Sequence, residues 1–130
     1  MGTGRSASGG EAGMSGTLVA QGYLCRAEEV AEGAARGFAL TGRRHKVIVL
    51  RKGGRLYGWL DACPHYDGGT PMAWKSDAYL NGAGTHLACH SHGAHFDMTT
   101  GVCTLGPCLG QALTRVELHV TTAGEVFAAI

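Results

Sequence analysis

Short apolar runs separated by glycine-rich turns occur along most of the chain, and their lengths are typical of β-strands rather than helices. The clearest pair lies within residues 45–62, on either side of Gly53 and Gly54. Two adjacent glycines allow the positive φ angles that a tight hairpin turn requires. Further strands are expected at 16–24, 36–40, 112–120 and 126–130, with a turn at 121–125 and a polar or single helical turn at 26–33. No stretch has helical periodicity over three or more turns, so the pattern predicts an all-β domain.

The length of 130 residues corresponds to one domain with a single core. Residues 1–16 contain little to bury and are expected to form a disordered tail, which leaves 17–130 as the folded domain. Strands are expected at both ends of that domain, with a loop-rich insert over about residues 61–110 between them. The apolar runs are too short to cross a membrane, and the N-terminus has no apolar core of a secretion signal. We therefore expect a soluble, cytoplasmic protein.

The insert contains two closely spaced pairs of metal-ligating residues. Cys63 and His65 are separated by one residue, Cys89 and His92 by two, and 23 residues lie between the pairs. An odd total of five cysteines in a cytoplasmic protein indicates metal ligands or buried thiols rather than a disulfide framework. Two thiolates and two imidazoles suit either a structural zinc ion or a 2Fe-2S cluster with two cysteines on one iron and two histidines on the other.

The spacing favours the cluster. Zinc sites with two cysteines and two histidines usually take both cysteines from one loop and both histidines from another. Here each loop supplies one of each, which suits a cluster whose two irons have different ligands.

These motifs resemble those of the Rieske iron-sulfur proteins, through "CPH", "CHSHGAHFD", "TGVC" and "GPCLG", with a looser similarity over residues 17–130. The resemblance implies an antiparallel β-sandwich base domain that carries a small, loop-rich cluster-binding subdomain. It further implies that Cys63 and Cys89 bind the buried ferric iron and that His65 and His92 bind the exposed, reducible iron. Gly93 would let the backbone approach the cluster, and Pro107 would belong to a rigid loop that covers it.

Two departures from the respiratory Rieske proteins indicate a subfamily. The loops lack the extra cysteine pair that links them in that group. That group also has a serine and a tyrosine hydroxyl near the cluster, and the corresponding positions here look like Ala94 and Phe96. Because hydroxyl donors favour the reduced cluster, their loss predicts a potential near the low end of the range of about −150 to +300 mV for Rieske centres. The resemblance is then to the soluble Rieske-type ferredoxins that supply oxygenases with electrons.

The resemblance therefore implies a one-electron carrier between a reductase and an oxygenase or similar acceptor, with no nucleic-acid or membrane partner. The chain has no room for the separate iron domain of an oxygenase, so it is expected to be a component of an oxidoreductase system rather than an independent catalyst. The alternatives are a Rieske subunit bound permanently to a larger oxidoreductase and a zinc-stabilised binding module.

Several residues of the insert have a second interpretation. Four acids and one base lie within 61–110, which suggests docking of the insert on a basic partner, although loops also collect aspartate for turns. Cys103 and Cys108 are expected to stay thiols rather than form a disulfide. Cys25 is expected to be buried packing. Residues 70–84 are expected to form either a partner surface or packing against the base domain.

Overall fold

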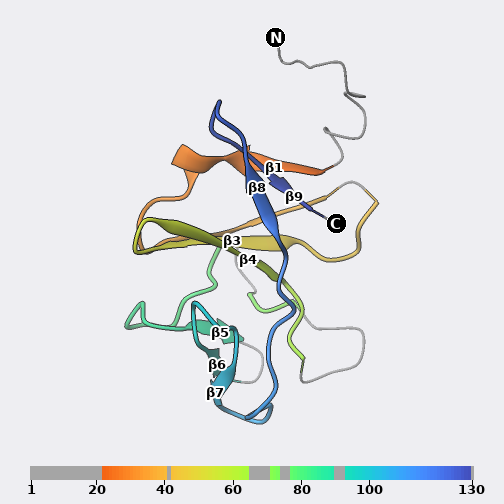
Figure 1. Cartoon of the computed structure of the whole chain (residues 1–130). Helices are drawn as coiled ribbons and strands as arrows, with labels where there is room; N and C mark the ends of the chain where they lie inside the picture. The colour runs from red at the N-terminus through yellow and green to blue at the C-terminus, as the bar shows by residue number, and fades with distance from the viewer. Residues whose placement is uncertain (1–21, 41, 65–70, 74–76, 90–92, 130) are drawn as a thin grey trace.

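The computed structural model describes residues 22–40, 42–64, 71–73, 77–89 and 93–129 (Figure 1). The described part of the chain forms three antiparallel sheets of three strands each. Their orders are β1-β9-β8, β2-β3-β4 and β5-β6-β7. The strands are β1 (Tyr23–Arg26), β2 (Ala35–Phe38), β3 (Val47–Lys52), β4 (Arg55–Leu60), β5 (Leu87–Cys89), β6 (Ala94–Phe96), β7 (Cys103–Leu105), β8 (Leu118–Val120) and β9 (Glu125–Ala128), and a 3-10 turn, η1, spans Ala27–Glu29.

The hairpin expected around the two adjacent glycines is confirmed. β3 pairs with β4 from Val47 opposite Leu60 to Lys52 opposite Arg55. Gly53 and Gly54 have φ angles of 62° and 80°, so both occupy the left-handed region that other residues disfavour. The Glu32 carboxylate accepts hydrogen bonds from both glycine amides, at 2.7 and 2.9 Å, which fixes the turn against the segment before β2.

β3 is the central strand of the molecule and is buried on both faces. Val47 and Val49 belong to one core, and Ile48 and Leu50 belong to another. Successive side chains of a strand point to opposite faces, so a continuous apolar run is expected where both faces are covered. In Figure 1 the β2-β3-β4 sheet accordingly lies between the β1-β9-β8 sheet and the small β5-β6-β7 sheet.

The core between the β1-β9-β8 sheet and the β2-β3-β4 sheet is the interior of the predicted base sandwich. Leu24, Cys25 and Val126 pack there with the valines of β3. Cys25 is only 1% exposed, as expected for a packing residue, and burial raises the pKa of its thiol to about 11. The predicted all-β sandwich with an inserted subdomain is confirmed.

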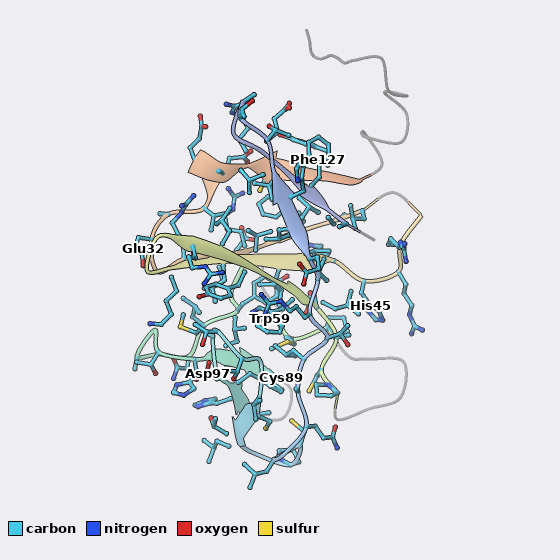
Figure 2. The ribbon with its side chains drawn as sticks, in the orientation of Figure 1. Glu32, His45, Trp59, Cys89, Asp97 and Phe127 are labelled. Atoms are coloured by element: carbon cyan, nitrogen blue, oxygen red, sulfur yellow. The ribbon has the colours of Figure 1, made fainter. Side chains whose placement is uncertain are left out.

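The inserted subdomain is tied to β4 and to the chain that returns from it. The Trp59 Nε1–H donates to the Met98 carbonyl at 3.2 Å, and in Figure 2 Trp59 lies between the middle sheet and the small sheet. Leu60 N–H donates to the Thr114 carbonyl at 2.8 Å, and Val116 N–H donates to the Gly58 carbonyl at 2.9 Å. The returning segment therefore runs beside β4 before it enters the base sheet.

Element boundaries differ from the sequence expectations in several places. The strand expected at 112–120 is regular only in β8, because residues 113–117 contact β4 through isolated hydrogen bonds and one bridge. Most of the strand expected at 16–24 and the whole tail 1–16 lie outside the described residues. The insert contains a sheet of its own, β5-β6-β7. No helix in the described ranges is long and apolar enough to cross a membrane.

Candidate metal centre

The two candidate cysteine ligands lie in the same buried cluster, between the middle sheet and the small sheet. Cys63 follows β4 by three residues, and Cys89 is the last residue of β5. Both are 0% exposed and pack in one core with Leu87 and Phe96. The expected histidine ligands, His65 and His92, lie outside the described residues. The fold thus assembles the cysteine half of the expected site from segments that are distant in sequence.

The second ligand segment is closed by a hydrogen bond at its base. Cys89 and Ala94 are opposite one another in the β5-β6 pair, and the Gly93 N–H donates to the Cys89 carbonyl at 2.8 Å. Gly93 has a φ of +73°, and nothing lies within 4 Å of the position that a Cβ would take there. Glycine is therefore required at this position by backbone conformation and not by crowding.

A buried carboxylate holds the first ligand segment in place. Asp61 is 6% exposed, its Oδ1 accepts from the Met72 N–H at 2.8 Å, and its Oδ2 accepts from the Tyr79 hydroxyl at 3.0 Å. Burial, followed by the negative charge of Asp61, raises the pKa of Tyr79. These contacts join the chain on either side of Cys63 to the segment before β5. Sequence reasoning considered Asp61 only as a surface charge, because nothing in "LDACPH" signals that the side chain is buried.

Residues 71–73 and 77–80 pack against the base in their described parts. Met72 is 0% exposed and Tyr79 is 3% exposed. A Cβ at Gly37 of β2 would overlap the Tyr79 hydroxyl. The hydroxyl therefore lies directly against the backbone of β2. Of the two interpretations of this segment, packing holds for Met72 and Tyr79.

The loop after β7 packs closely on β6. Gly106 has a φ of +110°, and a Cβ there would lie 2.7 Å from the Ala94 Cα. Any side chain at residue 106 would therefore push the loop away from β6. Pro107 is exposed at the tip of this loop, and Leu105 and Leu109 are 55% and 67% exposed.

Cys103 and Cys108 flank that loop, and both are free thiols in the structure. They are 2% and 0% exposed, and the Cys108 thiol donates to the Cys103 Sγ at 3.2 Å. The Cys103 thiol donates in turn to the Leu105 carbonyl at 3.3 Å. Burial raises the pKa of Cys108 to about 12, and hydrogen bonds with Cys103 and with Cys63 add to the rise. Sequence reasoning did not anticipate that Cys108 lies in the same core as Cys63, because 44 residues separate them in the chain.

Ala94 and Phe96, the two positions at which the resemblance implies that hydroxyl donors are absent, are both buried in the core that contains the cysteines. Neither side chain carries a polar atom, so neither can donate a hydrogen bond to a group held by Cys63 and Cys89.

Three of the four acids in the insert have internal partners. Asp61 is buried, and Asp77 accepts from the Gly37 N–H at 2.9 Å and from Arg36 Nε at 3.3 Å. Asp97 accepts from the amides of Thr99 and Thr100, which lowers the pKa of its carboxyl to about 2. The fourth, Asp67, lies outside the described residues. The aspartates thus serve turns and anchoring contacts, so the described acids do not support electrostatic docking.

The described residues fit the cysteine half of a 2Fe-2S site. Two buried thiols in one core suit iron or zinc, and the apolar surroundings would exclude water from a bound cluster. Among the described residues, no three histidine, cysteine, aspartate or glutamate side chains are arranged to hold a metal ion. The full expected set would require the two histidines that lie outside those residues.

Comparison with known proteins identifies the family. Residues 21–122 match the model of the Rieske [2Fe-2S] domain, so the chain belongs to the Rieske family. No curated protein matches the chain in sequence.

Solved structures share the fold. A chain in the complex of reduced oxygenase and oxidized ferredoxin in carbazole 1,9a-dioxygenase is 26% identical with a TM-score of 0.63, over 82% of this chain and 90% of that one. The ferredoxin of carbazole 1,9a-dioxygenase from Nocardioides aromaticivorans IC177 is 20% identical with a TM-score of 0.62, over 82% and 94% of the two chains. The terminal oxygenase of carbazole 1,9a-dioxygenase from Novosphingobium sp. KA1 is 22% identical with a TM-score of 0.63, over 86% of this chain but 32% of the oxygenase. The resemblance to Rieske-type ferredoxins inferred from the motifs is thus confirmed.

Proposed function

We propose that the protein is a soluble Rieske-type ferredoxin, a one-electron carrier between a reductase and an oxygenase or similar acceptor. The observation that carries the proposal is the burial of Cys63 and Cys89 in one core of a Rieske fold. The alignment supports a carrier, because the chain covers 90–94% of two matched chains, one of which is the ferredoxin of carbazole 1,9a-dioxygenase from Nocardioides aromaticivorans IC177.

The proposed ligands are Cys63 and Cys89 for one iron and His65 and His92 for the other. When bound, the 2Fe-2S cluster would accept and return a single electron. The protein's own contribution is to hold the two thiolates in a dry core and to limit the access of water. Gly93 donates to the Cys89 carbonyl at the base of the second ligand segment, and the loop containing Pro107 lies over β6 beside Ala94.

The proposed potential is low for a Rieske centre. Hydrogen bonds to the sulfurs stabilise the more negative, reduced state, and apolar side chains at the two hydroxyl positions remove two such bonds. Both positions, Ala94 and Phe96, are buried in the core of the proposed site, where water cannot replace the missing donors.

The proposed partner surface is the apolar tip of the loop after β7. Leu105 and Leu109 are exposed there, next to the buried thiols of Cys103 and Cys108. An oxygenase and a ferredoxin occur together in the carbazole 1,9a-dioxygenase complex, which supports a partner of that class for this chain. We propose that these leucines contribute more to docking than charge does, because Asp61, Asp77 and Asp97 are engaged internally.

Electron paramagnetic resonance of anaerobically purified protein, before and after dithionite, tests the proposal. We expect no signal in the oxidised state and a rhombic signal after reduction, with an average g value below that of all-cysteine clusters. Cys63→Ser and Cys89→Ser should each abolish that signal. Cys25→Ala should retain the signal, because this thiol is equally buried but lies in the core between the β1-β9-β8 and β2-β3-β4 sheets.

Three results would redirect the interpretation. A colourless protein that contains stoichiometric zinc would favour the zinc-stabilised module. Purification only as part of a larger oxidoreductase would favour a permanently bound subunit. A signal that persists in Cys63→Ser would refute the proposed ligand set.

A further inference from the structure

We propose that the exposed turn between β2 and β3, residues 42–46, is a docking surface for an acidic partner protein, with Arg43, Arg44 and Lys46 as its cations. The inference rests on the proposed function and names the chemistry of the partner's surface. Its sign is opposite to that of the sequence-based suggestion, in which an acidic insert docks on a basic partner.

The first observation is that these three cations have no internal partner. Arg43, Arg44 and Lys46 are exposed, and within the described part of the chain none of their side chains forms an ion pair or a hydrogen bond. Other cations of the described ranges are engaged in ion pairs, on backbone carbonyls or over an aromatic ring: Arg26, Arg36, Arg51, Arg55 and Arg115. Three cations without internal partners thus lie within four residues.

The second observation is the position of the turn beside the proposed centre. β3 and β4 pair antiparallel, so β3 begins beside the end of β4. The Asp61 N–H donates to the Lys46 carbonyl at 2.9 Å, and Asp61 precedes the proposed ligand Cys63 by two residues. Figure 2 shows His45 of this turn at the same end of the middle sheet. The basic turn therefore adjoins the segment that leads to Cys63.

The backbone of the turn is held without the help of its charged side chains. The Arg43 N–H donates to the Leu40 carbonyl at 3.1 Å, and Leu40 is buried in the core of the base sandwich. The Lys46 carbonyl accepts from Asp61, as described above. The cations can therefore be replaced without loss of the contacts that position the turn.

Three cations suit an acidic protein surface better than a nucleic acid or a membrane. Nucleic-acid-binding domains carry a strong excess of cations, whereas the formal net charge of this chain is +1. Electrostatic binding to anionic lipids takes clusters of about four to eight cations. A protein partner needs only a local patch of opposite sign, because charges at the rim of an interface act mainly on the rate of encounter. The turn would speed the encounter, and the leucines of the loop after β7 would contribute to the bound complex.

Reoxidation of the reduced, cluster-loaded full chain by small charged oxidants measures the field of the turn. Hexacyanoferrate(III) is the anionic probe and stands in for an acidic partner, and hexaammineruthenium(III) is the cationic probe. In both reactions one electron passes from the reduced cluster to the metal ion of the probe, and no bond forms or breaks.

The test variant is Arg43→Gln/Arg44→Gln, followed by stopped flow at an ionic strength of about 0.1 M, where charges act over about 10 Å. We expect its reaction with hexacyanoferrate(III) to be about twofold to fivefold slower than that of the native chain, because attraction by the turn is lost. Its reaction with hexaammineruthenium(III) should be faster. Both differences should disappear at about 1 M, where the Debye length falls to about 3 Å.

Lys52→Gln/Arg55→Gln is the matched control. It removes two positive charges from exposed positions, as the test variant does, but at the far end of β3 and β4, where Lys52 and Arg55 lie opposite one another. The six residues of β3, at about 3.3 Å each, place this end roughly 20 Å from the turn. Because this distance is about two Debye lengths at 0.1 M, the control should react with both probes at the native rates.

Fluorescence anisotropy of labelled poly-L-glutamate tests the preference for acidic protein without any electron transfer. The native chain and the Lys52/Arg55 control should bind this polymer with equal affinity, and the Arg43/Arg44 variant should bind it about twofold to fivefold more weakly. The native chain should not sediment with phosphatidylserine vesicles at about 0.15 M salt.

A rate with hexacyanoferrate(III) that did not depend on ionic strength would overturn the inference. Equal losses of rate in the two double variants would do the same, because net charge rather than the turn would then explain both. Sedimentation of the native chain with the vesicles would assign the turn to a membrane surface instead. If the native chain gave no reduced-state signal, the proposed function would fail, but the binding of poly-L-glutamate would still report on the turn, so the two failures are distinguishable.

Discussion

Tyr79→Phe removes one oxygen atom from the contact that anchors the proposed site, and its effect can be worked out from the geometry. The Tyr79 hydroxyl donates to the Asp61 carboxylate at 3.0 Å, and Asp61 stands two residues before Cys63. Phenylalanine keeps the ring and its packing. The change therefore isolates the hydrogen bond from the hydrophobic contribution of the side chain.

The expected cost follows from burial. Asp61 is 6% exposed and Tyr79 is 3% exposed, so water cannot replace the lost donor. A hydrogen bond to a charged group contributes about 1.5–3 kcal/mol to the free energy of unfolding. For a domain of this size, this corresponds to a fall in Tm of roughly 5–15 °C. The Asp61 Oδ1 bond to the Met72 amide remains, which should keep the variant folded at room temperature.

Thermal unfolding followed by circular dichroism measures the change. Tyr57→Phe is the matched control, because among the described residues the Tyr57 hydroxyl has no hydrogen-bond partner and the side chain packs at the edge of the same core. We expect the Tm of the control to stay within about 2 °C of the native value, in line with the small effects of substitutions away from special contacts. Equal Tm values for the two variants would refute the view that the Tyr79 hydroxyl anchors this segment.

Three further changes test other contacts of the fold and of the proposed surface. Gly101→Ala places a Cβ 2.6 Å from the indole ring of Trp59 at a φ of +75°, so it should lower the free energy of unfolding by about 2–4 kcal/mol in chemical denaturation. Gly84→Ala is the control, because its φ of +70° is similar but the space around it is open, and it should lower the free energy of unfolding by about 1–2 kcal/mol. The pKa of Asp97 is lowered to about 2 in the folded state, so its charge stabilises the fold above the usual carboxyl pKa of about 3.9, and this contribution is lost as the pH falls through about 2. The Tm difference between the native chain and Asp97→Asn should accordingly be constant from pH 7 to about 5 and shrink below about pH 4; a constant difference down to pH 2 would contradict this. Leu109→Ser should slow electron transfer to the partner several-fold with no loss of stability, whereas Val120→Ser, an exposed change on β8, should alter neither, and equal rates for both variants would exclude the leucine from docking.

The sandwich and its hairpin were predictable because the signals are local. Two glycines between apolar runs fixed the β3-β4 turn at Gly53 and Gly54, and those residues adopt the required φ angles. The strand expected at 112–120 was too long because its apolar pattern continues through residues that contact β4 without a regular ladder. Pattern alone does not distinguish a paired strand from an extended segment held by isolated hydrogen bonds.

The candidate ligands were also readable from the chain, because ligand chemistry depends on residue type and short spacing. Cys63 and Cys89 follow from that spacing, and the fold places both in one core. The roles of the acids were not readable. The local sequence does not distinguish Asp61 from Asp97. Asp61 is buried and accepts a hydrogen bond from Tyr79, whereas Asp97 accepts from the Thr99 amide and closes a turn.

By itself, the sequence determined the class of the protein: an all-β domain of the Rieske family with two Cys/His pairs in an insert. These properties reside in residue types, in their periodicity and in spacings of a few residues. Only the tertiary structure decided which side chains surround the cysteines, since contacts such as that between Trp59 and Met98, in the core that contains Cys63 and Cys89, join segments that no local pattern relates. The physical reason is that burial and hydrogen bonding depend on the packing of distant segments, whereas strand and turn propensities depend on neighbours along the chain.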